Sequence, residues 1–262
     1  MNILEQIVAV KRKEVELAKS IIPESQLRES IYFSRPTNSL VARLIDRKHT
    51  GIIAEFKRAS PSKGVINDTA NIEAVVQGYT EHGAAGISVL TDEQFFKGSL
   101  ADLEAARAAV PATPLLRKDF IIDEYQLLQA RAAGADVILL IAACLEKEAV
   151  KKLAAFAKSL QLEVLLEIHN EEEIDHICDD VDIVGVNNRD LKIFQVSIEP
   201  SIKLSEKIPA GKVKISESGI LSMDMVYELM RHGYSGFLIG EMFMREKDPA
   251  EAFQNFIQFQ SD

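Results

Sequence analysis

Short runs of β-branched and apolar residues alternate with longer amphipathic segments over the last four-fifths of the chain. This alternation is typical of strand–helix units repeated around a parallel sheet. Strands are predicted at residues 52–56, 87–90, 115–117, 137–141, 164–167, 183–186, 213–216 and 237–239. Helices are predicted at residues 71–82, 100–109, 123–133, 147–160, 171–178, 199–207, 222–232 and 249–259. Eight consecutive units in 262 residues favour a closed α/β barrel, the (β/α)8 or TIM barrel, over an open doubly wound sheet.

The first part of the chain, residues 1–50, does not fit the eight units. Its pattern predicts an amphipathic helix over residues 3–18, a turn around Pro23, and a second helix that begins at Asn38 or Ser39. No linker rich in proline, glycine or serine separates this segment from the barrel. We therefore expect a helical N-terminal extension packed on the barrel, within one domain that spans the whole chain.

Composition and charge narrow the class of protein. A net charge of -10 disfavours nucleic-acid binding, and no apolar run approaches the ~20 residues that a membrane helix needs. The N-terminal stretch is highly charged and lacks a signal-cleavage site, so a cytoplasmic location is expected. Its cluster from Lys11 to Lys13 is expected to be a solvated helix face. The cysteines and histidines lack metal-ligand spacing, so no metal is expected, and a monomer is expected because no hydrophobic stripe is left over.

The first predicted strand ends in charged residues. In a barrel, functional side chains gather at the carboxyl ends of the strands, and inward positions alternate. Glu55 and Lys57 are two residues apart, so both are expected at the barrel mouth, as a reactive pair or as a structural ion pair. The loop that follows contains Ser60 and Gly64 and either wraps a polar ligand or is only flexible.

Later strands end in further polar residues. Lys118 follows an apolar run, and a partly buried lysine can lower its pKa enough to exchange protons near neutrality. Glu167 ends the fifth strand, where apolar surroundings are expected to raise its pKa and suit acid–base chemistry. Asn187 and Arg189 share a face and are expected to hold substrate hydroxyls or an anion. His169 is expected to cap a loop.

The last two units carry glycines where barrels commonly bind phosphate. Glu217, Ser218 and Gly219 precede a helix, and the eighth strand is followed by Gly240 and Glu241. Backbone N–H groups and helix N-termini can converge on an anion at these places. The side chain of Glu241 is expected to point away from a phosphate while its N–H contributes. The pattern therefore predicts a phosphorylated ligand.

Over essentially its whole length the sequence resembles the indole-3-glycerol phosphate synthase family of tryptophan biosynthesis. The matching motifs occur in order at residues 55–64 (EFKRASPSKG), 90–92 (LTD), 95–99 (FFKGS), 116–121 (LRKDFI), 167–169 (EIH), 185–191 (GVNNRDL), 217–220 (ESGI) and 237–241 (FLIGE). The resemblance implies a carboxy-lyase that closes the indole ring of 1-(2-carboxyphenylamino)-1-deoxyribulose 5-phosphate, with loss of carbon dioxide and water. It implies an anionic phosphosugar substrate and no cofactor.

The resemblance also assigns roles to residues. Lys118 is the implied general acid, and Glu167 and Lys57 are a second acid–base pair whose division of labour stays open. Glu55 would orient Lys57 and Lys118, and Asn187 would hold a substrate hydroxyl. The full assignment has two sets of residues. The catalytic set is Glu55, Lys57, Lys118, Glu167, Asn187, Glu217 and Ser218. The substrate-binding set is Ser60, Phe96, Phe120, Arg189, Ser218, Gly219, Gly240 and Glu241.

Two alternatives remain at this point. One is another phosphate-binding barrel of the same pathway, such as phosphoribosylanthranilate isomerase or the α-subunit of tryptophan synthase. Neither is expected to combine the N-terminal extension with Glu55, Lys57, Lys118 and Glu167. The other is a barrel that binds phosphate without catalysis, which a turnover assay would distinguish.

Overall fold

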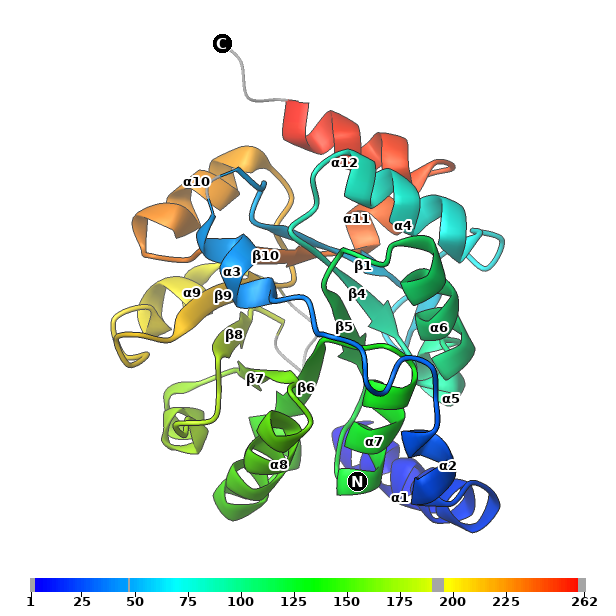
Figure 1. The fold of residues 1–262 in the computed structure, drawn as a ribbon. Coiled ribbons are helices and arrows are strands. Elements are labelled where there is room, and N and C mark those ends of the chain that lie inside the picture. The colour runs from blue at the N-terminus through cyan, green and yellow to red at the C-terminus, as the bar shows by residue number, and fades with distance from the viewer. Residues whose placement is uncertain (1–2, 47, 190–195, 259–262) are drawn as a thin grey trace.

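Eight parallel strands close into a barrel in the order β1-β10-β9-β8-β7-β6-β5-β4 (Figure 1). The computed structural model describes residues 3–46, 48–189 and 196–258. The barrel strands are β1 (Ile52–Phe56), β4 (Gly86–Leu90), β5 (Leu115–Lys118), β6 (Val137–Ile141), β7 (Glu163–Ile168), β8 (Ile183–Asn187), β9 (Val213–Glu217) and β10 (Gly236–Ile239). Each begins and ends within one residue of its prediction, so the predicted barrel is confirmed.

Helices surround the barrel, as the alternation predicts (Figure 1). They are α4 (Ile72–Glu81), α6 (Leu100–Ala109), α7 (Glu124–Ala132), α8 (Lys147–Ser159), α9 (Glu199–Leu204), α10 (Met223–Arg231) and α12 (Pro249–Gln258). The loops carry shorter elements, namely β2 (Ala59–Ser60), β3 (Gly64–Val65), α5 (Glu93–Phe96), η1 (Ala142–Cys144) and α11 (Glu241–Met244). Among the described residues, no helix is both long and apolar enough to cross a bilayer.

The predicted α-helix at residues 171–178 is wrong in type and length. This segment forms a short 3-10 helix, η2 (Glu171–His176). Asn170 accepts the N–H of Glu172, and the Glu173 carboxylate turns back to accept the N–H of His169. These local bonds tighten the turn and favour the narrower helix. The predicted end of the last helix, at Phe259, lies outside the described residues.

Two hydrophobic layers explain how the strands aim their side chains. Ile53, Leu116 and Leu165 belong to an apolar cluster inside the barrel. Ala54 and Phe56 belong to the larger cluster between the strands and the helices. Because side chains alternate along a strand, the residue between Ala54 and Phe56 faces the barrel interior. The same alternation directs the polar residues at the other strand ends toward the barrel mouth.

The N-terminal extension reaches both ends of the barrel. Helix α1 (Ile3–Ile21) contacts α7 and η1, and α2 (Glu24–Arg28) packs against α7 (Figure 1). Helix α3 (Leu40–Ile45) lies over the amino ends of the strands, where Leu40 and Leu44 join the interior cluster. Ser39 caps α3, one of the two predicted starts of this helix. The extension therefore closes one end of the barrel and borders the other.

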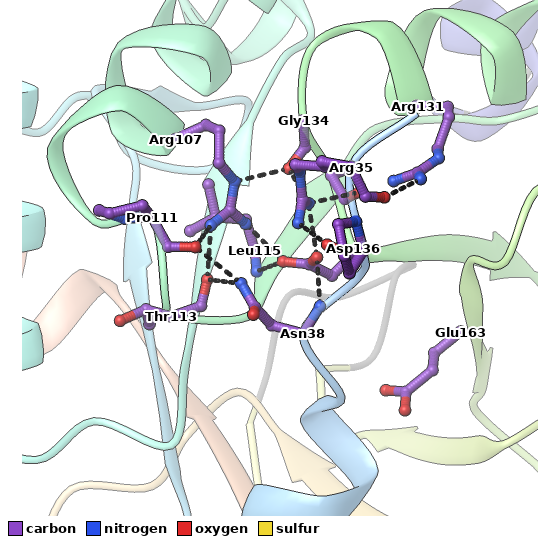
Figure 2. Close-up of polar contacts among 12 residues, drawn as sticks. Arg35, Asn38, Arg107, Pro111, Thr113, Leu115, Arg131, Gly134, Asp136 and Glu163 are labelled. Atoms are coloured by element: carbon purple, nitrogen blue, oxygen red, sulfur yellow. Dashed lines mark hydrogen bonds and ion pairs between the residues drawn. The ribbon is translucent and has the colours of Figure 1, made fainter. Parts of the chain in front are cut away.

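Two carboxylates attach the extension to the amino ends of the strands, the buried Asp136 (Figure 2) and the partly buried Glu163. Asp136 accepts the N–H groups of Asn38 and Leu115 at 2.8 Å each and forms ion pairs with Arg35 and Arg107. Glu163 accepts two backbone N–H groups from the first turn of α3 and the hydroxyl of Ser39. A carboxylate at a helix N-terminus is stabilised by the free N–H groups and the helix dipole. These contacts hold the extension on the barrel.

Candidate active site at the carboxyl ends of the strands

Five strands deliver a polar side chain to one cavity at the carboxyl ends of the barrel. These residues are Glu55 on β1, Lys118 on β5, Glu167 on β7, Asn187 on β8 and Glu217 on β9. Of the other predicted site residues, Lys57, Ser60, Phe96, Phe120, Arg189, Ser218 and Glu241 line the same cavity, and Gly219 and Gly240 line an adjoining one. The structure therefore brings the whole predicted set together.

Lys118 is the centre of the polar network. Its Nζ atom lies 3.0 Å from Oε2 of Glu167 and 2.8 Å from Oε2 of Glu217. Both carboxylates are buried, and the lysine side chain is only 13% exposed. Removing charges from water in this way is costly unless each charge has a partner. The ammonium group of Lys118 and the two carboxylates therefore stabilise one another, and removing any one of them would leave a charge without its partner.

The pKa directions expected for Lys118 and Glu167 are both wrong. Burial works to lower the pKa of Lys118, but the charges of Glu167, Glu217 and Glu55 raise it above its usual value. Burial works to raise the pKa of Glu167, but Lys118, His169 and the Asn187 amide lower it. For Glu217, burial prevails and raises the pKa. In the unliganded protein, Lys118 is thus an ammonium group, and Glu217 takes up a proton more readily than Glu167.

A second ion pair lines the same cavity. Oε1 of Glu55 lies 2.6 Å from Nζ of Lys57, and Ser88 donates to the other oxygen of Glu55 at 3.4 Å. Glu55 forms no hydrogen bond with Lys118 and acts on it only through its charge. Asn187 donates its amide to Oε1 of Glu167 at 3.1 Å. In the unliganded state, Asn187 therefore orients Glu167.

The outer rim of the cavity is held by Arg189. Its guanidinium lies 3.3 Å from Oε2 of Glu241 and 3.4 Å from the hydroxyl of Ser62, which is 3.4 Å from the hydroxyl of Ser60. Lys63 lies 3.5 Å from the other oxygen of Glu241. The side chain of Glu241 was expected to point away from this site, and instead it lines the cavity. The two cations compensate its charge. The last two residues of the motif at 185–191 lie outside the described residues.

An adjoining cavity contains the glycines predicted to bind phosphate. It is lined by Ser218, Gly219 and Gly240 together with Lys63 and Arg245, and it shares Lys57 and Arg189 with the first cavity. Gly219 has a φ of +71° and its Cβ would lie 1.9 Å from a methyl group of Val196. At Gly240, a Cβ would lie 2.7 Å from Oε1 of Glu55. Both positions therefore need glycine, for conformation or for close approach.

The cavity also has an apolar wall, of which only a part was predicted from the sequence. The rings of Phe96 and Phe120, both predicted, lie 6.1 Å apart at an angle of 38°. Ile3, Leu4 and Ile7 of α1 line the same cavity and were not predicted to do so. Their only signal was the amphipathic pattern of the extension, which does not tell which surface an apolar face covers. Lys63 and Arg245 were missed because neither lies at a strand end.

Lys11 contradicts the expectation of a solvated helix face. Its side chain is 5% exposed, and its Nζ atom lies 2.8 Å from Asp92 and 3.0 Å from Asp119. Asp119 also binds Arg117 and the hydroxyl of Thr91. Burial works to raise the pKa of Asp119, but these partners lower it to about 2. Lys11 therefore anchors α1 at the mouth, directly behind the strand that carries Lys118.

We expect Lys11→Met to raise KM at least tenfold and to lower the free energy of unfolding by about 3 kcal/mol. The substitution leaves the buried carboxylate of Asp92 without its cation and releases the apolar wall of α1. Urea titration and initial-rate kinetics measure the two effects. Lys13→Met is the matched control, because Lys13 is exposed on the same helix. Equal KM values for the two variants would show that α1 does not shape the cavity.

No cluster of three or more histidine, cysteine or acidic side chains with metal-binding geometry occurs among residues 3–46, 48–189 and 196–258. Cys144 and Cys178 are free thiols.

Comparison with known proteins identifies the family. The family model described as indole-3-glycerol phosphate synthase matches residues 4–256. The indole-3-glycerol phosphate synthase of Bacteroides thetaiotaomicron is 48% identical over 257 residues, which cover 98% of each chain. That of Chromobacterium violaceum is 44% identical over 264 residues and 99% of each chain.

Solved structures support the fold alone. The chain superposes with a TM-score of 0.61 on 3-hexulose-6-phosphate synthase from Salmonella typhimurium, at 12% identity over 80% of this chain and 99% of the other. The match to a protein called KGPDC from Streptococcus mutans has a TM-score of 0.57, at 14% identity over 79% of this chain and 97% of the other. The family model and the two close relatives extend through the N-terminal extension as well as the barrel, so the chain belongs to the indole-3-glycerol phosphate synthase family.

Proposed function

We propose that the chain converts 1-(2-carboxyphenylamino)-1-deoxyribulose 5-phosphate into indole-3-glycerol phosphate, carbon dioxide and water. The observation that carries this proposal is the ammonium group of Lys118 in a cavity that has an aromatic wall and adjoins a glycine-lined cavity. The wall fits the carboxyphenyl ring, and the glycine-lined cavity fits the phosphate. The ribulose carbonyl then lies between them, beside Lys118.

The first step is a carbon–carbon bond formation assisted by Lys118. The aromatic carbon that bears the carboxylate attacks the ribulose carbonyl carbon, and Lys118 donates a proton to the carbonyl oxygen, which becomes a hydroxyl. The bond to the carboxylate then breaks, its electrons restore the aromatic ring, and carbon dioxide leaves. An ammonium group placed where negative charge develops stabilises the transition state without reorganisation. The surrounding carboxylates keep Lys118 protonated before the substrate arrives.

The second step is loss of water from the new ring. The hydroxyl leaves with a proton from an acid, and a base removes a proton from the adjacent carbon. Glu167 and Lys57 are the proposed pair, because both line the cavity and both are held in place there. Asn187 donates a hydrogen bond to Glu167, and Glu55 forms an ion pair with Lys57. Glu55 orients Lys57, Asn187 orients Glu167 or a substrate hydroxyl, and Glu217 offsets the charge of Lys118.

The proposed phosphate site comprises Ser218, Gly219 and Gly240, with Arg189 and Lys63 close by. We expect Gly219→Val to raise KM about tenfold and to leave kcat within about twofold, since it removes binding that substrate and transition state share. Gly211→Val is the matched control: Gly211 also has a positive φ, but its Cβ would have open space and it lies outside both cavities. An unchanged KM in Gly219→Val would show that the phosphate binds at another site.

The proposed activity is tested by adding the substrate to purified protein in a chelator. Indole formation is followed by fluorescence and carbon dioxide is measured in the same sample. Equal release of both supports the proposal. Tight binding of the substrate without turnover would instead indicate a phosphate-binding barrel without catalysis.

We also propose that one chain is a complete catalytic unit, because a single chain supplies every side chain named for both steps. The active species is then a monomer. Size-exclusion chromatography with light scattering, and a specific activity that does not change on dilution, test this assignment.

A further inference from the structure

His169 lies just beyond β7, and the proposed reaction steps do not use it. Its imidazole lies between two carboxylates, with Nε2 3.3 Å from Oε1 of Glu167 and Nδ1 3.4 Å from Oε2 of Glu173. The exposed fractions of the three side chains are 12% for His169, 6% for Glu167 and 13% for Glu173. A histidine that only capped a loop would face a backbone group. Here both ring nitrogens face acids.

Glu173 is held in place independently of the ring. Its Oε2 accepts the backbone N–H of His169 at 2.7 Å, and its Oε1 accepts the side-chain amide of Asn170 at 3.0 Å. These two bonds fix the position of the Glu173 carboxylate beside the imidazole. Nε2 of His169 is buried and forms no aligned hydrogen bond. The nearest charged group to this nitrogen is the carboxylate of Glu167.

We propose that His169 is a positioning residue for the reaction: its imidazolium group bridges Glu173 and Glu167 and fixes the Glu167 carboxylate in its charged form. This inference rests on the proposed function, in which Glu167 exchanges protons during dehydration. Oε1 of Glu167 accepts a hydrogen bond from Asn187 and faces His169, which leaves the other oxygen for Lys118. The short 3-10 helix after β7 thereby serves the site, because it returns Glu173 to the imidazole.

The charges around the imidazole favour its protonated form. Burial works to lower the pKa of His169, but Glu173, Glu167 and the more distant Glu217 raise it. Burial raises the pKa of the nearby Cys144 thiol to about 12, so that group stays neutral. The ammonium group of Lys118, on the other side of Glu167, is already bound by Glu167 and Glu217.

The contribution of His169 is expected to increase during turnover. Lys118 must turn toward the substrate carbonyl to act as an acid, and Glu167 then loses its strongest positive partner. His169 and Asn187 become the groups that hold Glu167 as a carboxylate. Without the imidazolium charge, Glu167 binds a proton at higher pH, and the acidic limb of the pH profile moves upward.

The experiment compares His169→Gln, Glu173→Gln and the double variant with the natural protein. We expect kcat to fall about tenfold in His169→Gln, KM to stay within about twofold, and the acidic limb of kcat to move up by about one pH unit. Glu173→Gln should shift the limb in the same direction. The double variant should be no slower than the slower single variant, because both act through one charge.

A direct titration separates this inference from the proposed function. Nuclear magnetic resonance of the imidazole should give His169 a midpoint above the usual value, and that midpoint should fall in Glu173→Gln. His232 is the internal control, since it pairs with Glu228 four residues away on the surface. A His169 midpoint at or below the usual value, or an acidic limb that does not move, overturns the positioning role. Absence of turnover in the natural protein overturns the proposed function and leaves the titration interpretable.

Discussion

Replacing Lys118 with methionine should lower kcat by about three orders of magnitude or more, because it removes both a positioned proton donor and a charge at the reacting oxygen. Methionine has a similar length and carries no charge. It also leaves Glu167 and Glu217 facing each other with no cation between them, so one of the two must take up a proton. Initial rates from indole fluorescence measure the loss.

Lys118→Arg separates the charge from the proton. Arginine keeps a cation between the two carboxylates but does not release its proton near neutral pH. If proton donation is the main contribution, Lys118→Arg should be almost as slow as Lys118→Met. Lys147→Met is the control for a lysine outside the cavity, since Lys147 pairs with Asp175 on the surface. Turnover of Lys118→Met within tenfold of the natural protein would remove Lys118 from the reaction.

The barrel was predictable because each of its signals is local. Strand β1 and strand β6 match their predicted bounds at both ends, since apolar runs bounded by short polar loops mark buried parallel strands. The polar site residues followed from one further rule, that strand ends meet at one mouth, whereas Phe96 and Phe120 came only from the resemblance to the family. Glu55 and Glu217 lie far apart in the sequence, and the barrel brings both to the same cavity.

What the sequence did not predict depends on contacts between distant segments. Lys11 looks like one charge in a solvated cluster until α1 is placed against Asp92 and Asp119. Lys118 in an apolar strand suggests a lowered pKa, yet two carboxylates from other strands reverse the direction. Neither effect leaves a periodic trace in the sequence. In both cases the sign of an electrostatic effect was set by the partner rather than by burial.

Ion pairs serve different purposes at the two ends of the barrel. At the carboxyl ends, ion pairs leave room for a ligand and line cavities. At the amino ends, the side chains of Asp136 and Arg107 are fully buried, paired with each other and surrounded by backbone groups and Arg35 (Figure 2). The guanidinium of Arg107 donates to the carbonyl groups of Gly134, Val110 and Thr113 as well as to Asp136. A substitution at this end should therefore change stability and leave the chemistry intact.

We expect Asp136→Ala to lower the free energy of unfolding by about 4 kcal/mol, within the range for breaking a buried ion pair by removing one partner. The loss leaves the cation of Arg107 buried and unpaired, and it frees Arg35 and two backbone N–H groups of the extension and β5. Urea unfolding followed by circular dichroism measures the change. Asp136→Asn should lose less, because one amide oxygen still accepts hydrogen bonds.

The matched control for Asp136 is Asp175→Ala, which removes an exposed acid that pairs with a surface lysine and should leave the unfolding midpoint unchanged. Below its unfolding transition, Asp136→Ala should keep the kcat and KM of the natural protein, because Asp136 lines neither cavity of the site. A large fall in kcat at full folding would mean that the amino end of the barrel also sets the geometry of the site. A loss of stability with unchanged kinetics would show that Asp136 serves to attach the extension to the barrel and has no part in catalysis.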